Sequence, residues 1–463
     1  MYIPLMAMTF VKKGGRESGN GLGFRIFKSY VRFFFCRLYY RKVHWSGMEH
    51  IPENCPLMIV SNHQNGVCDP LGVLFAVRGR KNRQLKTIVR ADVFHIPIFT
   101  TIVRWIGLLP AYRLSFDGEN ALANNAGTFE EVENELLRDG TVIIFPEAGH
   151  QDKHWLGKFS LAYLRILFET AKKSDFKKDL FILPTCNHYS SYFGVRKKML
   201  VKFGTPVALS PYYELYKTKP WTAQRQVNEV IRRQISDMML NITDTDNYSA
   251  IDYLRNTYGI RYAEAHRLNP DLLPDKLSAD KLLFAQLEAA KTQGKNILKI
   301  YDDVRELKEK SEQLRIEDCN FDEKYVSWQV FGSIAIMVVL FPFAAAALAT
   351  NILIFLIPRI IARRIKDRML HSTVYIAVNV LVTFPLSCLA MFGLIWRLTG
   401  NLFYGLPAML SVPLSGLFAL WYCRQWKRLS GRIRFGKLLK HRKLDAYITV
   451  RQRVFANLDQ ILA

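Results

Sequence analysis

Three long stretches without a charged residue lie in the last third of the chain, and no other feature restricts its folding as strongly. They are Val330–Ile357, Thr373–Trp396 and Leu402–Cys423. A helix needs about 20 apolar residues to cross the ~30 Å hydrocarbon core of a bilayer, so each stretch is long enough to span it. The sequence therefore predicts a membrane region over residues 327–423, after a mixed globular sequence over residues 1–326.

Basic residues around these stretches predict their topology. The connection Arg359–Arg368 and the segment after Cys423 are both strongly basic, whereas Arg397–Asn401 carries a single charge. Basic connections remain in the cytosol, so both basic segments are predicted there. Three simple spans would instead place the globular part and the tail on opposite sides of the membrane. The first stretch must therefore enter and leave the membrane on one face. A break near Phe341-Pro342 would leave two arms of about 14 residues, which rise only ~21 Å each at 1.5 Å per residue.

We therefore predict a re-entrant hairpin rather than a span for the first stretch. The predicted elements are this hairpin at 330–357, two spans at 373–396 and 402–423, and a basic cytoplasmic tail at 424–463. This topology makes the protein integral to the membrane and puts its globular part on the cytoplasmic face.

Two helical regions are predicted outside the membrane part. Within residues 1–41, Phe24–Tyr40 alternates aromatic and apolar residues with arginine and lysine, which is typical of an amphipathic helix in the membrane interface. A helix packed on the protein core has a similar apolar face, but the aromatic excess favours the interface. Residues 216–326 are rich in Lys, Glu, Leu and Gln, and they predict several helices.

Short apolar runs alternate with helical patterns between residues 42 and 215. The runs that predict buried strands are Leu57–Val60, Thr87–Val89, Thr141–Phe145, Leu180–Leu183 and Met199–Phe203. The helical patterns between them are Leu71–Val77, Ile98–Ile106, Ala121–Leu137 and Phe159–Lys172. This alternation predicts an α/β fold in which helices flank a mostly parallel sheet.

The formal net charge of +24 indicates an anionic partner. Nucleic acid is disfavoured because the chain has no zinc-finger spacing, RNA-binding aromatic signature or basic zipper. Membrane lipids and phosphate-bearing substrates suit the apolar stretches better. Seven scattered cysteines without a Cys-x-x-Cys pair predict neither disulfides nor a zinc site. His150 and His154 are spaced like ligands on a helix but lack a third ligand, so we predict no metal.

A histidine and a carboxylate follow the first predicted strand. They are His63 and Asp69 in Ser61-Asn62-His63-Gln64-Asn65-Gly66-Val67-Cys68-Asp69-Pro70. Such a carboxylate holds the imidazole in one tautomer and stabilises the imidazolium that forms when the ring accepts a proton. Gly66 gives the loop freedom to turn back. The pair suits a general base, although taken alone a polar loop after a strand looks the same.

Three further blocks occur at predicted strand ends. In Gly107-Leu108-Leu109-Pro110-Ala111-Tyr112-Arg113, the guanidinium of Arg113 follows a Gly/Pro turn and suits a phosphate. In Phe145-Pro146-Glu147-Ala148-Gly149-His150, Glu147 is placed to bind a substrate hydroxyl or orient Arg113. Lys158 opens the helix predicted from Phe159, which is a natural phosphate site. Pro184 ends a buried strand and is expected to form part of the wall of the site rather than to take part in the chemistry.

Together the four blocks resemble the glycerol-phosphate and lysophosphatidate acyltransferase family. Its pattern runs Asn-His-x4-Asp, Gly-x-x-Phe-x-x-Arg, Phe-Pro-Glu-Gly and an apolar strand with Pro, and the blocks occur here in that order over roughly residues 40–215. The resemblance implies an acyltransferase domain over 42–215. It implies His63 as the general base, Asp69 as the group that orients it, and Arg113 as the ligand of the acceptor phosphate beside the turn of Glu147 and Gly149.

Three positions depart from the common pattern. Five residues, rather than four, separate His63 from Asp69, Pro110 stands where Phe is usual, and Ala148 follows Glu147. The first two departures resemble a branch that includes fungal-type glycerol-3-phosphate/dihydroxyacetone-phosphate acyltransferases. That branch also has a membrane region after the catalytic domain, broadly like residues 327–423.

The resemblance implies direct acyl transfer in phospholipid synthesis, without a cofactor. The donor would be a thioester, acyl-CoA or acyl carrier protein, and the acceptor a hydroxyl of glycerol 3-phosphate or 1-acylglycerol 3-phosphate. Two alternatives are another lysolipid acceptor, such as a lyso-ornithine lipid, and a catalytically silent membrane scaffold. Arg113 and Lys158 favour a phosphate-bearing acceptor, and the intact pair of His63 and Asp69 favours catalysis.

Overall fold

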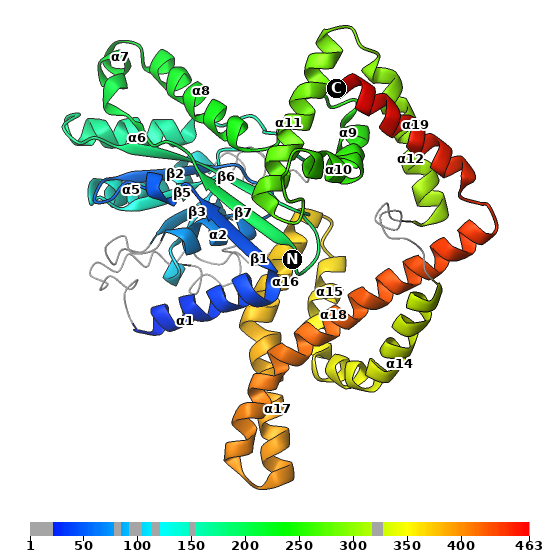
Figure 1. Ribbon diagram of the computed structural model, residues 1–463. Helices are drawn as coiled ribbons and strands as arrows, with labels where there is room; N and C mark the ends of the chain where they lie inside the picture. Colours follow the sequence, from blue (N-terminus) through cyan, green and yellow to red (C-terminus); the bar gives the residue numbers. More distant parts are fainter. Residues whose placement is uncertain are drawn as a thin grey trace, which may run out of the picture.

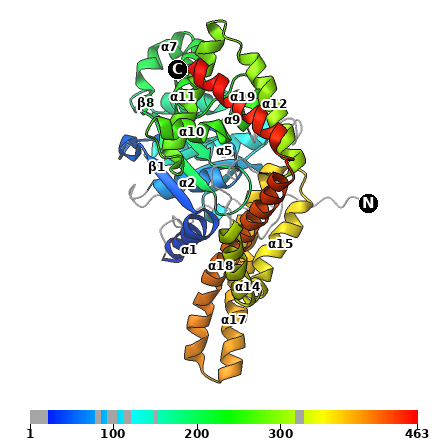
Figure 2. The ribbon, with the colours of Figure 1, turned by 45° about the vertical axis from the view of Figure 1, so that its right-hand side comes forward.

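A twisted sheet with helices on both faces forms one end of the molecule, and long helices project from it (Figure 1). A computed structural model describes residues 22–77, 85–91, 104–112, 121–147, 153–316 and 327–462. Helix α14 and the α17–α18 pair extend away from the sheet, while helices α9 to α12 and α19 lie beside it (Figures 1 and 2).

The sheet is mixed but mostly parallel. Its described strands are β1 Lys42–Ser46, β2 Leu57–Ser61, β3 Lys86–Arg90, β4 Leu108–Ala111, β5 Thr141–Ile144, β6 Phe181–Tyr189, β7 Lys198–Phe203 and β8 Val207–Ala208. Their order is β1-β7-β6-β2-β5-β3-β4, with β8 beside β6. Only β6–β7 and β6–β8 are antiparallel among the described pairs. The predicted α/β fold with a mostly parallel sheet is confirmed.

Successive side chains of a strand point to opposite faces of the sheet, so the apolar core has one part on each face. In β2, Met58 and Val60 pack with helices α5 Ala121–Leu137, α6 Ala162–Lys173 and α8 Pro220–Met238. Leu57 and Ile59 pack on the other face with α2 Cys68–Ala76 and with aromatic residues of the N-terminal helix. Both faces are buried because a parallel sheet is covered by the helices that connect its strands.

Three strands were not predicted, one of them the two-residue β8. Strand β1 contains Lys42, His44 and Ser46, so it lacks an apolar run, and it lies at one edge of the sheet beside β7. Strand β4 contains Pro110 and follows Gly107, so the segment looked like a turn. Its pairing with β3 is possible because β4 is the other edge of the described sheet, where a missing N–H is tolerated.

The region after the sheet is a helical layer that includes the end of the chain. It contains α9 Tyr248–Asn256, α10 Tyr258–Ala265, α11 Leu273–Thr292, α12 Ile297–Leu314 and α19 Asp445–Leu462. Tyr447, Val454 and Leu458 of α19 are buried against apolar residues of this layer. Residues 445–462 therefore form a packed helix, which differs from the predicted tail over 424–463.

Three helices are long and apolar enough to cross a membrane within the described residues. They run over Trp328–Thr350, Arg368–Thr399 and Leu402–Lys440. The first is α14 Ser327–Thr350; the second combines η6 Arg368–Leu370, α16 His371–Val378, η7 Asn379–Thr383 and α17 Phe384–Thr399; the third is α18. Many of their apolar side chains, such as Phe331, Leu389 and Leu410, are exposed, as expected for surfaces that face lipid.

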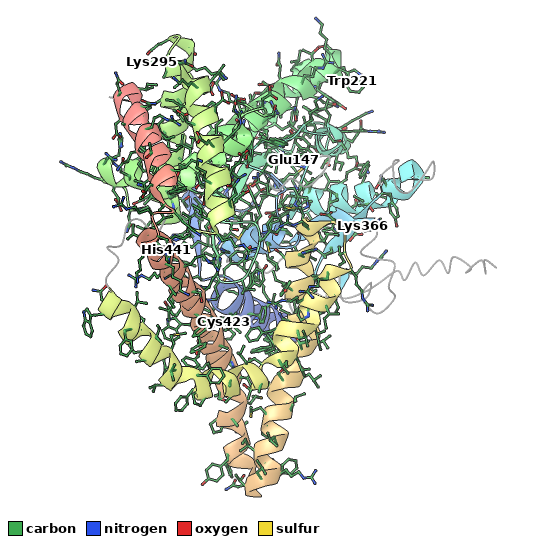
Figure 3. All side chains as sticks on the ribbon, turned by 90° about the vertical axis from the view of Figure 1, so that its right-hand side faces the viewer. Glu147, Trp221, Lys295, Lys366, Cys423 and His441 are labelled. Carbon is green, nitrogen blue, oxygen red and sulfur yellow. The ribbon has the colours of Figure 1, made fainter. Side chains whose placement is uncertain are left out.

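The first apolar stretch has a different break from the expected one. Helix α14 continues through Pro342 and ends at Thr350, and Asn351 separates it from α15 Ile352–Arg363. Helix α14 runs away from the sheet and α15 returns toward it (Figure 1). Lys366, after α15, and His441, after α18, both lie at the end of these helices that adjoins the folded layers (Figure 3).

The N-terminal helix is partly packed and partly exposed. It comprises α1 Leu22–Phe33 and the π-helix η2 Phe34–Tyr39. Phe34 and Phe35 are buried in the core, and the Phe34 ring contacts Phe384 of α17 edge-on, with ring centroids 5.7 Å apart. Leu22 and Ile26 are exposed. Core packing therefore accounts for the second half of the predicted amphipathic helix, and an apolar surface remains on the first half.

Candidate active site

The loop between β2 and α2 brings His63 and Asp69 together. The His63 Nδ1 atom lies 2.8 Å from Asp69 Oδ2. Asp69 is fully buried in the first turn of α2, while the His63 side chain keeps 15% of its surface exposed. An ionised Asp69 accepts the Nδ1–H, and in this tautomer Nε2 carries the lone pair that can take a proton. The arrangement is that of a general base with its orienting carboxylate.

Asp69 is held by hydrogen bonds on both of its oxygens. Oδ2 also accepts the backbone N–H groups of Gln64 and Asn65, each at 2.8 Å. Oδ1 accepts the hydroxyl of Tyr189, at the end of β6. A buried carboxylate requires donors of this kind to offset its desolvation. The same contacts fix the loop that carries His63.

Glu147 joins the neighbouring strand end to this loop. Its Oε1 accepts the backbone N–H of His63 at 3.0 Å, and its Oε2 accepts the N–H of Gly157 at 3.0 Å. Burial, opposed by these two hydrogen bonds, raises the pKa of Glu147 to about 7. The His63 ring also stacks on Phe145, with centroids 4.6 Å apart. The backbone and the ring of His63 are therefore positioned by the segment that ends β5.

Asn62 extends the sheet beyond the last residues of β2. Its side-chain amide donates to the carbonyl of Asn187 at 3.0 Å and accepts the Asn187 N–H at 2.7 Å. This pair of bonds imitates the pairing of a strand residue with β6. It holds the backbone just before His63 against the centre of the sheet.

A buried polar chain connects the loop to the helical layer. The Tyr192 hydroxyl donates to Gln64 Oε1 at 3.0 Å and lies 3.0 Å from His154 Nδ1. Arg255 of α9 donates to His154 Nε2 at 2.7 Å. Burial, reinforced by Arg255, holds the pKa of His154 well below its ordinary value. His154 is therefore neutral, and its Nδ1–H is available to the Tyr192 oxygen. It connects Tyr192, after β6, to Arg255 of the helical layer.

A helix of the second long apolar segment also contacts the loop. Thr373 Oγ1 of α16 accepts the backbone N–H of Val67 at 3.0 Å, although the two residues are 306 positions apart. Gly66 has a φ of +46°, and a Cβ at this residue would lie 2.3 Å from Thr373 Oγ1. Gly66 is thus required both by its backbone conformation and by the close approach of α16.

The structure brings some of the predicted site residues together and not others. His63, Asp69 and Glu147 converge, and Pro184 is buried in β6, where it pairs with Val60 of β2. Arg113 and Gly149 lie outside the described residues.

The predicted placement of Lys158 at a helix N-terminus is wrong. Helix α6 begins at Ala162, and Phe159 instead forms a β-bridge with Glu147. Lys158 is exposed beside this bridge. The apolar pattern that begins at Phe159 includes a short extended segment before the helix, which hydrophobic periodicity alone does not separate from a helical turn.

Sequence reasoning missed three residues of the site: Asn187, Tyr189 and Thr373. Tyr189 and Asn187 lie beyond the strand end that was predicted at Leu183, because β6 continues to Tyr189. The continued run Thr185-Cys186-Asn187-His188-Tyr189 contains the β-branched and aromatic residues that strands favour, so its composition was available as a signal. Thr373 has no local feature that would connect it to Val67.

Other candidate chemistry in this region is not supported by the geometry. Burial raises the pKa of the Cys68 thiol, so it remains protonated rather than acting as a nucleophile. Among the described residues, no group of three His, Cys, Asp or Glu side chains is placed to hold a metal ion.

The segment that contains His63, Asp69 and Glu147 matches a known family model. Residues 42–187 match the family model described as Acyltransferase. The chain is 26% identical over 136 residues to "Glycerol-3-phosphate O-acyltransferase 2" of Saccharomyces cerevisiae, covering 29% of this chain and 18% of the length of that relative. A solved structure, the 1-acyl-sn-glycerophosphate (LPA) acyltransferase of Thermotoga maritima, aligns with 46% of this chain and 78% of that chain at 19% identity and a TM-score of 0.34.

Proposed function

Because residues 42–187 form a domain of the acyltransferase family, we propose that the protein transfers an acyl chain from a thioester to a hydroxyl of a phosphate-bearing glycerol acceptor. The observation that carries this proposal is the 2.8 Å contact between His63 Nδ1 and the buried Asp69. The acceptors proposed are glycerol 3-phosphate and 1-acylglycerol 3-phosphate. The name of the yeast relative supports the first of them.

The geometry suits a direct transfer in which His63 handles one proton. The acceptor hydroxyl gives its proton to His63 Nε2 as its oxygen attacks the thioester carbonyl carbon. The tetrahedral intermediate then collapses, the carbon–sulfur bond breaks, and the imidazolium returns the proton to the departing thiolate. The products are an ester and a free thiol, either coenzyme A or acyl carrier protein, so no cofactor is consumed. Asp69 stabilises the imidazolium that forms between the two steps.

The proposed location is an integral membrane protein with its catalytic domain on the cytoplasmic face. Three apolar helices support the membrane part. The cytoplasmic orientation is supported by the basic residues after α15 and in the second half of α18, since basic connections remain in the cytosol.

The function is tested by thiol release from acyl-CoA, with detergent-solubilised protein and a panel of acceptors. We expect release with glycerol 3-phosphate or 1-acylglycerol 3-phosphate, and a decrease of about 10²- to 10⁴-fold in kcat for His63→Ala, the usual contribution of a general base. His441→Ala, at an exposed position after α18, should retain the wild-type rate. Equal rates for wild type and His63→Ala would remove His63 as the base.

The identity of the acceptor is read from the products by mass spectrometry. Exclusive acylation of a lysolipid without a glycerol phosphate group, unaffected by excess glycerol 3-phosphate, would replace the proposed acceptor while leaving the acyl transfer intact. Absence of thiol release with every acceptor and with both thioester carriers would favour a scaffold over an enzyme.

A further inference from the structure

A cavity lies between the acyltransferase domain and the apolar C-terminal helices. Its volume is about 350 Å³, within the range of pockets that bind small ligands. Its walls come from η2, the turn after β6, α15, α16, η7 and α18, together with the start of α17. None of the residues His63, Asp69 and Glu147 lines it. The cavity is therefore separate from the reacting groups.

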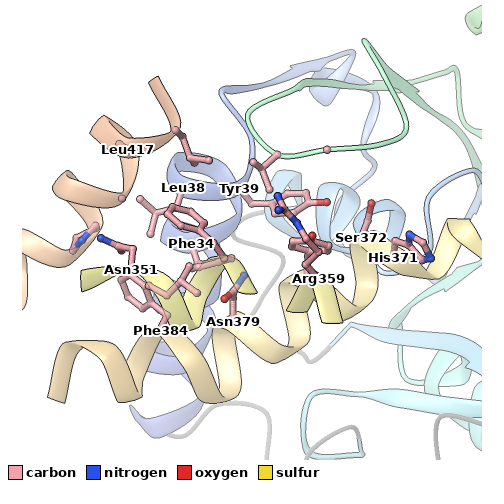
Figure 4. A pocket seen from close by; sticks show the side chains of 18 of the residues that line it. Phe34, Leu38, Tyr39, Asn351, Arg359, His371, Ser372, Asn379, Phe384 and Leu417 are labelled. Atoms are coloured by element: carbon pink, nitrogen blue, oxygen red, sulfur yellow. The ribbon is translucent and has the colours of Figure 1, made fainter. Parts of the chain in front are cut away.

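The cavity has one basic end and one apolar end. Arg359, Ser372 and His371 gather toward one end, whereas Phe384 and Leu417 lie toward the other (Figure 4). Ser372 is buried. The ligand that fits this arrangement is amphipathic, with an anionic group and a long apolar part.

The basic end has a second guanidinium with a defined position. Arg368 also lines the cavity, and its Cζ lies 4.3 Å from the centroid of the Phe193 ring. Asp367, the nearest carboxylate in sequence, instead caps the backbone N–H of Met369 at 3.0 Å. Within the described ranges, neither Arg359 nor Arg368 forms an ion pair with a carboxylate. Two such guanidinium groups match the oxygens of a phosphate.

The position of the cavity specifies where its ligand comes from. Its apolar end lies among α15, α17 and α18, which carry exposed apolar side chains of the predicted membrane region. Its basic end adjoins the run Arg359–Arg368, where an anionic headgroup layer would meet the protein. We propose that this cavity binds an anionic phospholipid of the bilayer, with its phosphate between Arg359 and Arg368 and one acyl chain along Phe384 and Leu417.

The bound lipid contacts the same helix that closes the catalytic loop. His371, Ser372 and Tyr375 of α16 line the cavity, while Thr373 of the same helix accepts the N–H of Val67. The lipid site is therefore one helix away from the loop that carries His63. A bound lipid would therefore contact the helix that holds this loop.

The proposal is tested by photolabelling of the full-length protein in phosphatidylcholine nanodiscs, without an acyl donor. The probe is a phosphatidate with a diazirine near the end of one acyl chain. We expect labelled peptides from α15 and α18 that contain Phe355 or Leu417. The double substitution R359Q/R368Q should decrease this labelling by about tenfold, the loss that corresponds to 1.4 kcal/mol. Leu417→Trp, which fills the apolar end, should abolish it.

Matched substitutions outside the cavity provide the controls. Arg363→Gln, on the same helix as Arg359, and Leu414→Trp, one turn before Leu417, change exposed residues that do not line the cavity. Both should keep wild-type labelling. The diazirine analogue of phosphatidylcholine should label α15 and α18 less, and excess inorganic phosphate should not displace the phosphatidate, because phosphate lacks the acyl chain.

Three results would overturn the proposal. The first is labelling confined to peptides that contain His63 or Glu147, which would place the lipid at the reaction site alone. The second is equal labelling by phosphatidylcholine, which would indicate lipid contact without headgroup recognition. The third is displacement by inorganic phosphate, which would indicate an anion site. Since no acyl donor is present, none of these results depends on the proposed acyl transfer.

Discussion

Asp69 has more hydrogen-bond donors than its contact with His63 requires. The backbone N–H groups of Gln64 and Asn65 and the Tyr189 hydroxyl all point at this one buried carboxylate. Each donor helps to offset the burial of the carboxylate and fixes its orientation toward His63. Tyr189 is the donor that can be removed without changing the loop backbone.

The substitution Tyr189→Phe tests this role. Loss of the hydroxyl removes the donor to Asp69 Oδ1, so the carboxylate is held less firmly against His63. We expect kcat/KM to fall by about tenfold, since a hydrogen bond to a charged group contributes about 1.5–3 kcal/mol. Tyr192→Phe, which changes the bond to Gln64 instead, should lower kcat/KM less. Equal losses of kcat/KM for the two variants would contradict a role of Tyr189 through Asp69.

Glu147 predicts a pH dependence of stability. Its pKa is about 7 in the folded protein and 4.5 ordinarily, so the folded state holds the proton more tightly. Its contribution is fully present below pH ~4.5 and is lost as the pH rises through ~7, by about 3 kcal/mol at most. The melting temperature of wild type should thus fall relative to Glu147→Gln between pH 5 and 7.5. The exposed Glu214→Gln provides the control. A difference between wild type and Glu147→Gln that stays constant with pH would contradict the assignment.

At the scale of elements, the loop that carries His63 lies between the sheet and helix α16. Gly66→Ala should lower kcat by at least about tenfold, because a positive φ costs about 1–3 kcal/mol for other residues and its Cβ would meet Thr373 Oγ1. Thr373→Ala alone removes one hydrogen bond to Val67, worth about 1 kcal/mol. The double variant should lose less than the sum of both, since the clash is gone. Additive losses, measured by steady-state kinetics, would separate α16 from the loop.

Elements with a local pattern in the sequence were predicted, whereas contacts between distant segments were not. Apolar runs located β2 and β5, and the four motif blocks predicted an acyltransferase domain, in agreement with the family model that matches residues 42–187. Strand β1 was missed because an edge strand needs few apolar residues. The contact between Val67 and Thr373 could not be predicted, since it depends on how two distant segments pack rather than on either local pattern.

At the scale of the whole molecule, helix α19 constrains the topology. It packs on the helical layer beside the sheet, so the end of the described chain lies beside the acyltransferase domain. The helices α17 and α18 form one pair that goes out and returns. A chain that crossed a bilayer through this pair alone would return to the side of the acyltransferase domain, and the α14–α15 segment would then have to enter and leave on one face, as the hairpin prediction requires. Helix α14 ends at Thr350 rather than at Pro342.

Single cysteines in a background without the native ones test this topology. A reagent that cannot cross the bilayer should label Leu370→Cys from the side of the acyltransferase domain and Thr399→Cys, near the α17–α18 turn, from the opposite side. Pro342→Cys should react from neither side or from the domain side. Reaction of Pro342→Cys from the far side would contradict a re-entrant hairpin and make α14 a span.

The hydrogen bond from Val67 to Thr373 has a mechanical consequence. A helix whose apolar length differs from the thickness of the surrounding hydrocarbon changes its tilt to compensate. Thr373 lies near one end of the apolar segment Arg368–Thr399, so a change of tilt displaces it relative to Gly66. The chemistry at His63 would then depend on bilayer thickness, which is set in part by the acyl chains that an enzyme of this class installs.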